Sequence, residues 1–223
     1  MFTEMVLRSR EELQPVLAAK LNRSALKGGV PEIYNKSFDL VRANCAYSRP
    51  PAVDVASLTY LTLSECAAVG IHSSMAENTL PHPERTEVYT EVGKDIGPLL
   101  EYFNGAVPIE HVGIYFSEHI RNLYSGENPT QYLVSPTGAA QILVESQITY
   151  GLVLDGALCD QQVLKQYGLL FLANTACLSQ QDTEAIAEYV RDGGNLVVTG
   201  ETSLFDENGR FRGEFLLGDV LSV

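Results

Sequence analysis

Three carboxylates near the end of the chain have the residue types and the spacing to do chemistry. Glu201, Asp206 and Glu207 fall within one predicted loop, where two carboxyl groups could divide acid and base roles or hold a cation. The alternative is a solvated acidic loop in which the Asp-Glu-Asn-Gly stretch at residues 206–209 forms a turn. We expect the turn and keep the carboxylate pair as the second interpretation.

Cys177 is the candidate nucleophile. It is predicted at the carboxyl end of a strand, where doubly wound folds place their ligands, and His111 or His119 could approach it in space as a base. No histidine follows Cys177 in the chain, and free cysteines are usually buried and unreactive. We therefore expect a buried structural thiol. The four cysteines are widely spaced, without C-x-x-C, which indicates neither zinc nor a redox pair: Cys45, Cys66, Cys159 and Cys177.

Composition excludes several classes of protein. The formal net charge of −13 over 223 residues disfavours nucleic acid as a partner, because binding to phosphates needs clustered lysine and arginine. No apolar run approaches the roughly 18 residues of a membrane span, and the first residues lack the apolar core of a secretory signal. We expect a cytoplasmic globular protein with no nucleic-acid partner, no membrane partner and no cofactor.

The second half of the chain shows the clearest periodicity. Apolar runs at residues 111–116, 150–155, 169–173 and 195–199 predict buried strands, and the segments between them have helical spacing. Ser179 and Asp182 predict a capped helix start, and Gly193 predicts the end of that helix. This alternation predicts a doubly wound, flavodoxin-like parallel sheet with the first strand between the second and third.

The first half is predicted to be mostly helical. Helices are expected at residues 11–25, 57–68 and 84–103, the last kinked at Pro98, with one strand in 69–75 and irregular structure at 34–36. So little strand suggests the remnant of a larger α/β fold. The inward face predicted for the last helix consists of Val88, Val92, Ile96, Leu99 and Leu100.

Two strings carry a family resemblance. The sequences YGLLFLANTACLSQQ (residues 167–181) and YVRDGGNLVVTGETSLFD (residues 189–206) resemble, in order and spacing, the trimerisation domain of family 42 β-galactosidases and related hypothetical glycosyl hydrolases. FLLGDVL at residues 215–221 resembles the closing helix of that family. The resemblance covers about half of the chain, from His111 onward. It implies a trimerisation-like domain at residues 106–223, preceded by a partial glycoside hydrolase barrel at residues 1–105.

The trimerisation domain is similar in fold to class I glutamine amidotransferases, which raises an enzyme hypothesis. Such an enzyme needs a cysteine at a tight turn between a strand and a helix. At the corresponding turn Glu201 or Thr202 stands where the thiol would be required. The resemblance therefore implies a non-catalytic assembly domain. The alternatives are an amidotransferase-like hydrolase with an unrecognised nucleophile and a small-molecule binding module, although the chain has no glycine-rich phosphate loop.

The barrel resemblance brings two further candidates. Glycosidases use two carboxylates that flank the scissile bond, and Glu4 could lie near a barrel strand end; otherwise it is an exposed residue at a frayed terminus. His72, at the end of a final barrel strand, could line a sugar pocket; otherwise it is a buried histidine. In family 42 the catalytic glutamates lie on barrel strands preceding this region, so carbohydrate is expected to bind only through a complete barrel.

The remaining polar candidates concern assembly. His82, between two prolines, is expected to be exposed and without a role. Asn122 and Tyr124 are expected in a loop after the first strand of the sheet, in contact with a neighbouring subunit or the barrel rim, with ligand binding as the alternative. Apolar helix faces without their barrel strands would need a partner. We expect a homo-oligomer, with the trimer implied by the resemblance and a symmetric dimer as the alternative.

Overall fold

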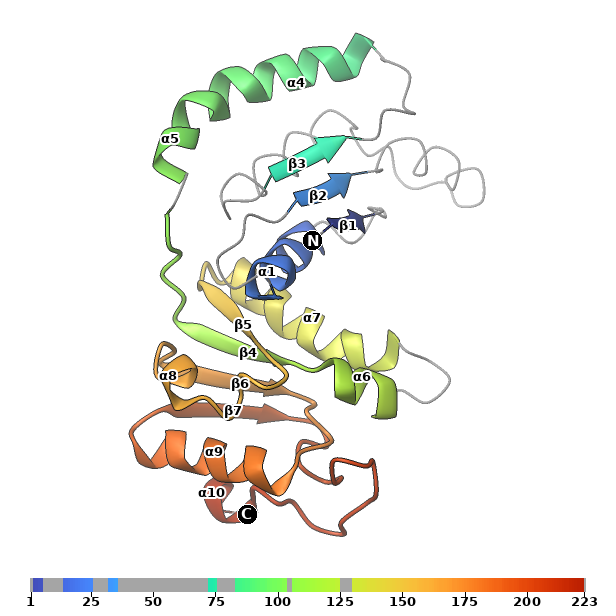
Figure 1. The fold of residues 1–223 in the computed structure, drawn as a ribbon, viewed down its shortest axis with the longest axis vertical. Helices are drawn as coiled ribbons and strands as arrows, with labels where there is room; N and C mark the ends of the chain where they lie inside the picture. Colours follow the sequence, from blue (N-terminus) through green and yellow to red (C-terminus); the bar gives the residue numbers. More distant parts are fainter. Residues whose placement is uncertain are drawn as a thin grey trace. The chain divides into compact units, whose positions relative to one another are not determined.

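The chain folds as two compact units, Met1–Pro108 and Ile109–Val223 (Figure 1). The interpretation of the first unit as part of a glycoside hydrolase barrel stays a prediction. Within the described residues no helix combines the length and the apolar composition needed to cross a membrane. The computed structural model describes residues 2–5, 14–25, 32–35, 72–75, 83–103, 106–124 and 130–222.

The first unit contains a parallel sheet whose strands follow one another in chain order. Glu4 lies opposite Tyr34, and Tyr34 lies opposite Ser74, in the registers of the two strand pairs. Sequential order is the arrangement of barrel strands, whereas a doubly wound sheet reverses direction at its centre. The elements are β1 (Phe2–Met5), α1 (Gln14–Ala25), β2 (Glu32–Asn35) and β3 (His72–Met75), with the sheet order β1-β2-β3.

The sequence predicted only one of these three strands. Residues 34–36 were expected to be irregular, yet β2 ends at Asn35, and Glu4 lies in a strand rather than at a frayed end. Strands of four residues are too short for a clear alternation of apolar and polar positions, so pattern reading misses them. The helix predicted at residues 57–68, as well as Cys45, Cys66 and His82, lies outside the described residues.

The long helix predicted before the second unit is interrupted at the predicted position. Pro98 has no backbone N–H to continue the α-helical hydrogen bonds, and a 3-10 turn takes over there, which confirms the kink. The expected inward orientation is wrong for Leu99 and Leu100, which are 44% and 49% exposed. The side chains of Val88 and Val92 are not among those described. The segments are α4 (Pro83–Ile96), η1 (Gly97–Leu99) and α5 (Leu100–Phe103).

The second unit is the predicted doubly wound domain. Its four strands are all parallel in the order β5-β4-β6-β7, so the first strand of the unit lies between the second and the third, as expected. The strands are β4 (Val112–Phe116), β5 (Tyr150–Leu154), β6 (Leu169–Ala173) and β7 (Asn195–Thr199). The helices are α6 (Glu118–Tyr124), α7 (Thr130–Glu145), α8 (Gln161–Leu164), α9 (Gln180–Arg191) and α10 (Gly218–Leu221).

Right-handed crossovers place α7 on one face of this sheet and α8 and α9 on the other. The central strand β4 is buried along its whole length, and Ile114, Val153 and Leu170 have no exposed surface. Each such side chain stabilises the fold by about 1.5–3 kcal/mol. β7 was expected to be a buried run, but its residues alternate between exposed and half-buried. β7 is an edge strand, and α7 packs on β4 and β6. One face of β7 is therefore not covered by α7.

The signals at the ends of α9 are confirmed. The Ser179 hydroxyl accepts a hydrogen bond from the Asp182 N–H at 3.1 Å, and the Asp182 carboxylate accepts one from the Ser179 N–H at 3.0 Å. Gly193 follows the helix with φ +98°, a conformation that glycine adopts without strain.

The segment between β4 and β5 differs from the prediction. Residues 121–126 were expected to form a loop, but α6 begins directly after Ser117, whose hydroxyl accepts a hydrogen bond from the Ile120 N–H at 3.0 Å. α7 begins at Thr130, and Pro136 lies inside the helix. Ser117 is an N-cap signal that the sequence reading missed.

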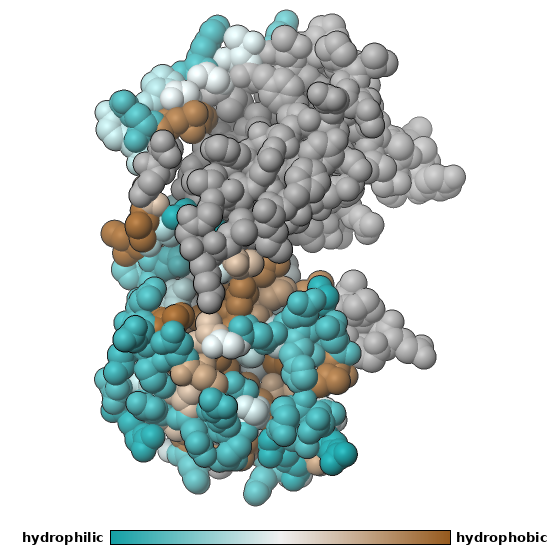
Figure 2. All heavy atoms as spheres, viewed as in Figure 1, coloured by the Kyte–Doolittle hydropathy of each residue, from teal (hydrophilic) through white to brown (hydrophobic). Residues whose placement is uncertain are grey.

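The second unit also exposes large apolar side chains, and Figure 2 shows brown atoms at its surface among hydrophilic ones. Isolated exposed apolar residues are ordinary, so only their grouping along an element is informative. Those more than a third exposed are Ile109, Leu123, Val134, Ile142, Ile148, Val197, Phe211 and Phe215.

Candidate functional site

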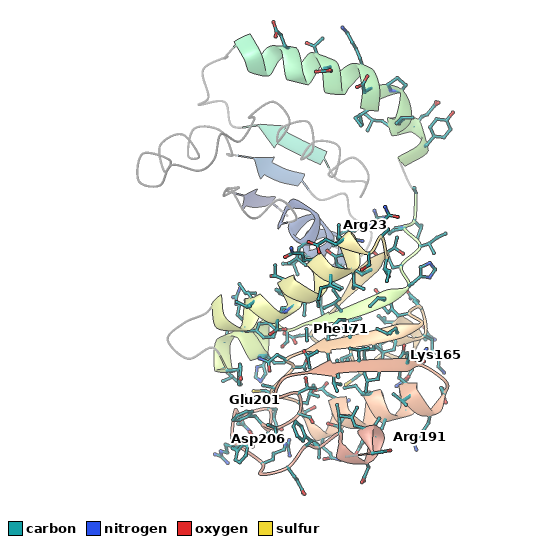
Figure 3. All side chains as sticks on the ribbon, turned by 180° about the vertical axis from the view of Figure 1, so that it is seen from behind. Arg23, Lys165, Phe171, Arg191, Glu201 and Asp206 are labelled. Atoms are coloured by element: carbon teal, nitrogen blue, oxygen red, sulfur yellow. The ribbon has the colours of Figure 1, made fainter. Side chains whose placement is uncertain are left out.

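The carboxyl ends of the parallel strands are the place where a doubly wound fold would hold a ligand. Figure 3 shows Glu201 and Asp206 at this end of the sheet and Lys165 and Arg191 at the opposite end. Cys177, the candidate nucleophile that we expected to be structural, and the three candidate carboxylates all follow β6 or β7. Their possible role therefore depends on what their side chains contact.

The turn after β7 has a left-handed backbone at Gly200 and at Ser203, with φ +63° and +68°, and not at Glu201 or Thr202, where the nucleophile position was predicted. A left-handed backbone is the conformation that a nucleophile at a tight turn would adopt. A Cβ atom at Gly200 would lie 2.3 Å from the side-chain oxygen of Asn174. Gly200 therefore has no nucleophilic side chain and no space for one.

Asn174, the first residue after β6, fills that space. Its own backbone is strained, with φ +51°, and its N–H donates to the Thr199 hydroxyl at 3.1 Å. Its side-chain oxygen accepts a hydrogen bond from the Glu201 N–H at 2.9 Å. These bonds join the end of β6 to the turn after β7. The sequence reading missed Asn174, although asparagine is the residue that most readily adopts a left-handed backbone after glycine.

The hydroxyls beside the turn are also used for structure. The buried Thr202 hydroxyl accepts a hydrogen bond from the Thr175 N–H at 3.0 Å and donates to the Thr199 carbonyl at 2.7 Å. The hydroxyl of Ser203, a residue with no exposed surface, accepts from the Leu217 N–H at 3.2 Å. Neither oxygen is presented to a substrate.

Cys177 is buried, at 4% exposure. Burial raises the pKa of its thiol to about 11, with a further contribution from the Asp206 charge, so the thiol stays protonated at neutral pH. A nucleophilic cysteine needs the thiolate. The ring nitrogen Nε2 of His119 lies 2.6 Å from the Glu207 carbonyl oxygen, and His111 is exposed at the amino end of β4. The arrangement supports a structural thiol.

The other described cysteine is equally inert. Burial and a hydrogen bond to Asp182 raise the pKa of the Cys159 thiol to about 11, and its sulfur donates to the Asp182 carboxylate at 3.3 Å. Both described cysteines therefore lack the features of a reactive thiol.

Asp206 forms the predicted turn. Its carboxylate accepts hydrogen bonds from the N–H groups of Asn208 at 2.9 Å and Arg210 at 2.8 Å. The hydrogen bond from Arg210 is the largest of the effects that lower the pKa of this carboxyl. The Gly209 N–H also donates to the Asp206 carbonyl at 2.9 Å. The expectation of a turn at residues 206–209 is confirmed.

The other two carboxylates have separate partners. Glu201 accepts a hydrogen bond from the hydroxyl of Tyr124, and Glu207 lies 3.6 Å from the Arg212 guanidinium. Across the described part of the chain no group of three potential ligands is arranged to hold a metal ion. The geometry gives no support to a shared acid–base or cation site.

Tyr124 belongs to α6 rather than to a loop, and it packs into an aromatic row. Its ring lies 5.7 Å from that of Phe205, which lies 5.6 Å from that of Phe211. Burial and the hydrogen bond to Glu201 raise the pKa of the Tyr124 hydroxyl. Asn122 is exposed on the same helix.

A carboxylate that sequence reading overlooked caps α6. Asp155 follows β5 and accepts hydrogen bonds from the Tyr115 hydroxyl at 2.9 Å, the Glu118 N–H at 2.9 Å and the His119 N–H at 3.1 Å. Burial, followed by the Asp155 charge, raises the pKa of Tyr115. An aspartate after a strand is a common ligand position, but here its oxygens are occupied by the protein itself.

The two barrel-based candidates belong to the first unit. Glu4 lies within β1, and His72 is the first residue of β3. The sugar-pocket hypothesis for His72 required a strand carboxyl end. Because β3 begins rather than ends at His72, that argument is wrong for this residue.

Comparisons with known structures find the same fold in β-galactosidases. The enzyme from Rahnella sp. R3 is 15% identical with a TM-score of 0.69, covering 94% of this chain and 34% of its own. The enzyme from Bacillus circulans sp. alkalophilus is 14% identical with a TM-score of 0.67, covering 92% and 33%. A catalytic mutant of the glycoside hydrolase family 42 β-galactosidase from G. stearothermophilus is 14% identical with a TM-score of 0.56, covering 86% and 35%.

These likenesses define the class of fold. The chain shares the α/β architecture of a part of these β-galactosidases and spans about a third of their length. Comparisons with known protein families and with curated proteins find no match.

Proposed function

We propose that this chain is a non-catalytic assembly part of a glycoside hydrolase related to the family 42 β-galactosidases, acting in carbohydrate metabolism. The observation that carries the proposal is the closed turn after β7. Gly200, the first left-handed residue of this turn, has no side chain, and the Asn174 oxygen lies 2.3 Å from the point that the Cβ atom of any larger residue would occupy. Ser203, the second, has no exposed surface, and its hydroxyl accepts a hydrogen bond from the Leu217 N–H. No exposed hydroxyl or thiol at a left-handed position of this turn is therefore available to begin an amidotransferase-like reaction.

The partial barrel is the second element of the proposal. The first unit has three described parallel strands in sequential order, which is compatible with a piece of a (β/α)8 barrel. A glycosidase needs carboxylates on both sides of the scissile bond. We therefore expect sugar to bind and react only where a complete barrel is present, and we assign no substrate to this chain alone.

Assembly follows from the resemblance of the second unit to a trimerisation domain. We propose that copies of the chain associate, with the trimer as the expected form. The chain carries a net charge of −13, and like charges across an interface oppose association. We therefore expect the contacting surfaces of the copies to be largely uncharged.

Activity assays test the non-catalytic part of the proposal. The purified chain is expected to release neither glutamate from glutamine nor the aglycone from an aryl β-galactoside, at any concentration tested. Cys177→Ser is the matched variant. Glutamate release that disappears in this variant would contradict the proposal, because it would make Cys177 a nucleophile despite its burial.

A further inference from the structure

The segment that joins the two units is irregular and exposed. The chain passes from the first unit to the second between Pro108 and Ile109, and residues 106–109 form neither helix nor strand (Figure 1). Val107 is 85% exposed and Ile109 is 75% exposed. Two aliphatic side chains are therefore presented to solvent at the boundary of the units, where the chain has no secondary structure.

This segment is hydrogen-bonded at each end, in both cases within its own unit. On the side of the first unit the Arg23 guanidinium donates to the Ala106 carbonyl at 2.9 Å. On the side of the second unit the His111 N–H donates to the Thr149 carbonyl at 3.1 Å. Between these two bonds, residues 107–109 form no backbone hydrogen bond with any residue that the structure describes. Three consecutive residues therefore lack backbone support.

Backbone conformation distinguishes this segment from other exposed apolar residues. Val134 and Ile142 are 72% and 60% exposed, but they belong to the helix α7. An endoprotease binds its substrate as an extended strand, so a helix must first unfold locally, whereas residues 107–109 have no such hydrogen bonds to break. Pro108 also disfavours a helical backbone at Val107 and biases it toward the extended conformation that a protease needs.

A cut in this segment leaves the second unit complete. Among the described residues, the buried hydrophobic side chains all lie between Val112 and Leu217, and the four strands of the second sheet pair with one another. The unit spans Ile109–Val223, which is within the roughly 100–150 residues of a typical domain. Cleavage before Val107 or Ile109 would remove no strand and no described core residue from it.

We infer that residues 106–109 are a proteolytic processing site for an endoprotease that selects aliphatic residues. The cut falls at the Ala106–Val107 bond or at the Pro108–Ile109 bond, since the remaining bond is to the proline nitrogen, which has no N–H. Hydrolysis adds one water molecule across the amide and leaves a new carboxyl end on the first unit and a new amino end on the second. The inference does not depend on the proposed function, and it adds a reaction that separates the two units.

Limited proteolysis of the full chain tests the site. Thermolysin cuts on the amino side of aliphatic residues, and mass spectrometry identifies the fragments. We expect the first stable fragment that ends at Val223 to begin at Val107 or Ile109. A stable fragment of the second unit that begins at another residue would overturn the inference, and so would degradation of the second unit without such a fragment.

A pair of double variants separates the conformation of the segment from its exposure. Val107→Gln combined with Ile109→Gln is expected to slow the formation of this fragment at least ten-fold. Val134→Gln combined with Ile142→Gln is the matched control, which removes two comparably exposed aliphatic side chains from a helix and should leave the rate unchanged. Circular dichroism confirms that both variants are folded. Equal rates in the two variants would overturn the inference.

The released fragment provides a second measurement. Because its core is complete, we expect it to unfold cooperatively on heating, as followed by circular dichroism. A fragment without a cooperative transition would overturn the release of a folded unit, even where the cut falls at the expected bond. Self-association of the uncut chain tests the proposed assembly function separately, so either proposal can fail while the other stands.

Discussion

At the carboxyl end of the second unit's sheet the polar groups are hydrogen-bonded within the protein, whereas on the outer side of α7 apolar side chains are exposed. At the sheet end, Asn174, Thr202 and Asp155 are hydrogen-bonded to neighbouring backbone or side-chain groups, and the turn apex is closed. On α7, Val134 and Ile142 are largely exposed and have no polar role. The polar groups that could do chemistry hold the fold together, and the exposed apolar groups are those available to a partner.

The largest expected loss of stability comes from adding a side chain at Gly200, in the turn after β7. Gly200→Ala should lower the free energy of unfolding by about 3 kcal/mol, because alanine resists the positive φ and its Cβ displaces the Asn174 oxygen from the Glu201 N–H. Gly156→Ala is the matched control: Gly156 has φ +80° and nothing within 4 Å of its Cβ position, so it should lose only about 1 kcal/mol. Urea unfolding measures both. Equal losses would show that Asn174 does not close the turn.

The next largest effect compares two buried hydroxyls at the same end of the sheet, one that is hydrogen-bonded and one that is not. Thr202→Val removes the acceptor of the Thr175 N–H and should cost about 2 kcal/mol, since a buried donor is left unsatisfied. Thr175→Val should change the stability by less than about 0.5 kcal/mol, because the buried Thr175 hydroxyl has no hydrogen-bond partner among the described residues. Thermal unfolding of the two variants decides; a larger loss for Thr175→Val would reverse the assignment.

A smaller effect is expected at high pH. Burial raises the pKa of the Tyr132 hydroxyl from 10.0 to about 12, so the folded state holds this proton more tightly than the unfolded state does. The associated stability is complete below pH 10 and is lost as pH rises through about 12; by pH 11 the loss is about 1 kcal/mol. Tyr132→Phe should lose correspondingly less stability between pH 9 and pH 11. An identical pH dependence in the variant would contradict the shift.

The smallest effect is expected for the candidate nucleophile. Cys177→Ala should cost about 1 kcal/mol of stability, as a small cavity in a buried site does. It should leave self-association unchanged, because the thiol is buried. A loss of association by sedimentation in a variant that remains folded would place Cys177 in the interface and contradict its structural role.

The sequence predicted the elements whose signals are local. The cap formed by Ser179 and Asp182, the left-handed Gly193 and the positions of the four parallel strands all follow from neighbouring residues or from long apolar runs. β2 was missed because its four residues, Glu-Ile-Tyr-Asn, show no clear period. α6 was missed because Asn122 and Tyr124, which follow the first strand of the sheet closely, were interpreted as part of a loop.

The site was harder to predict because its residues act across the fold. The left-handed residues of the turn are Gly200 and Ser203 rather than Glu201 or Thr202. Nothing near Gly200 along the chain shows that Asn174, 26 positions earlier, occupies the space beside it. Asp155 likewise caps a helix that precedes it in the chain. Contacts of this kind depend on how strands are ordered in the sheet, so a local pattern does not contain them.

Light scattering of the unmodified chain over the range from about 1 to 100 µM tests the central claim most directly, because an assembly domain must self-associate where an isolated enzyme need not. We expect a mass of at least twice the 24.4 kDa of the chain at the upper end of this range, and a fall toward the chain mass on dilution if the contact is reversible. A mass near 24.4 kDa at every concentration would contradict the assembly function.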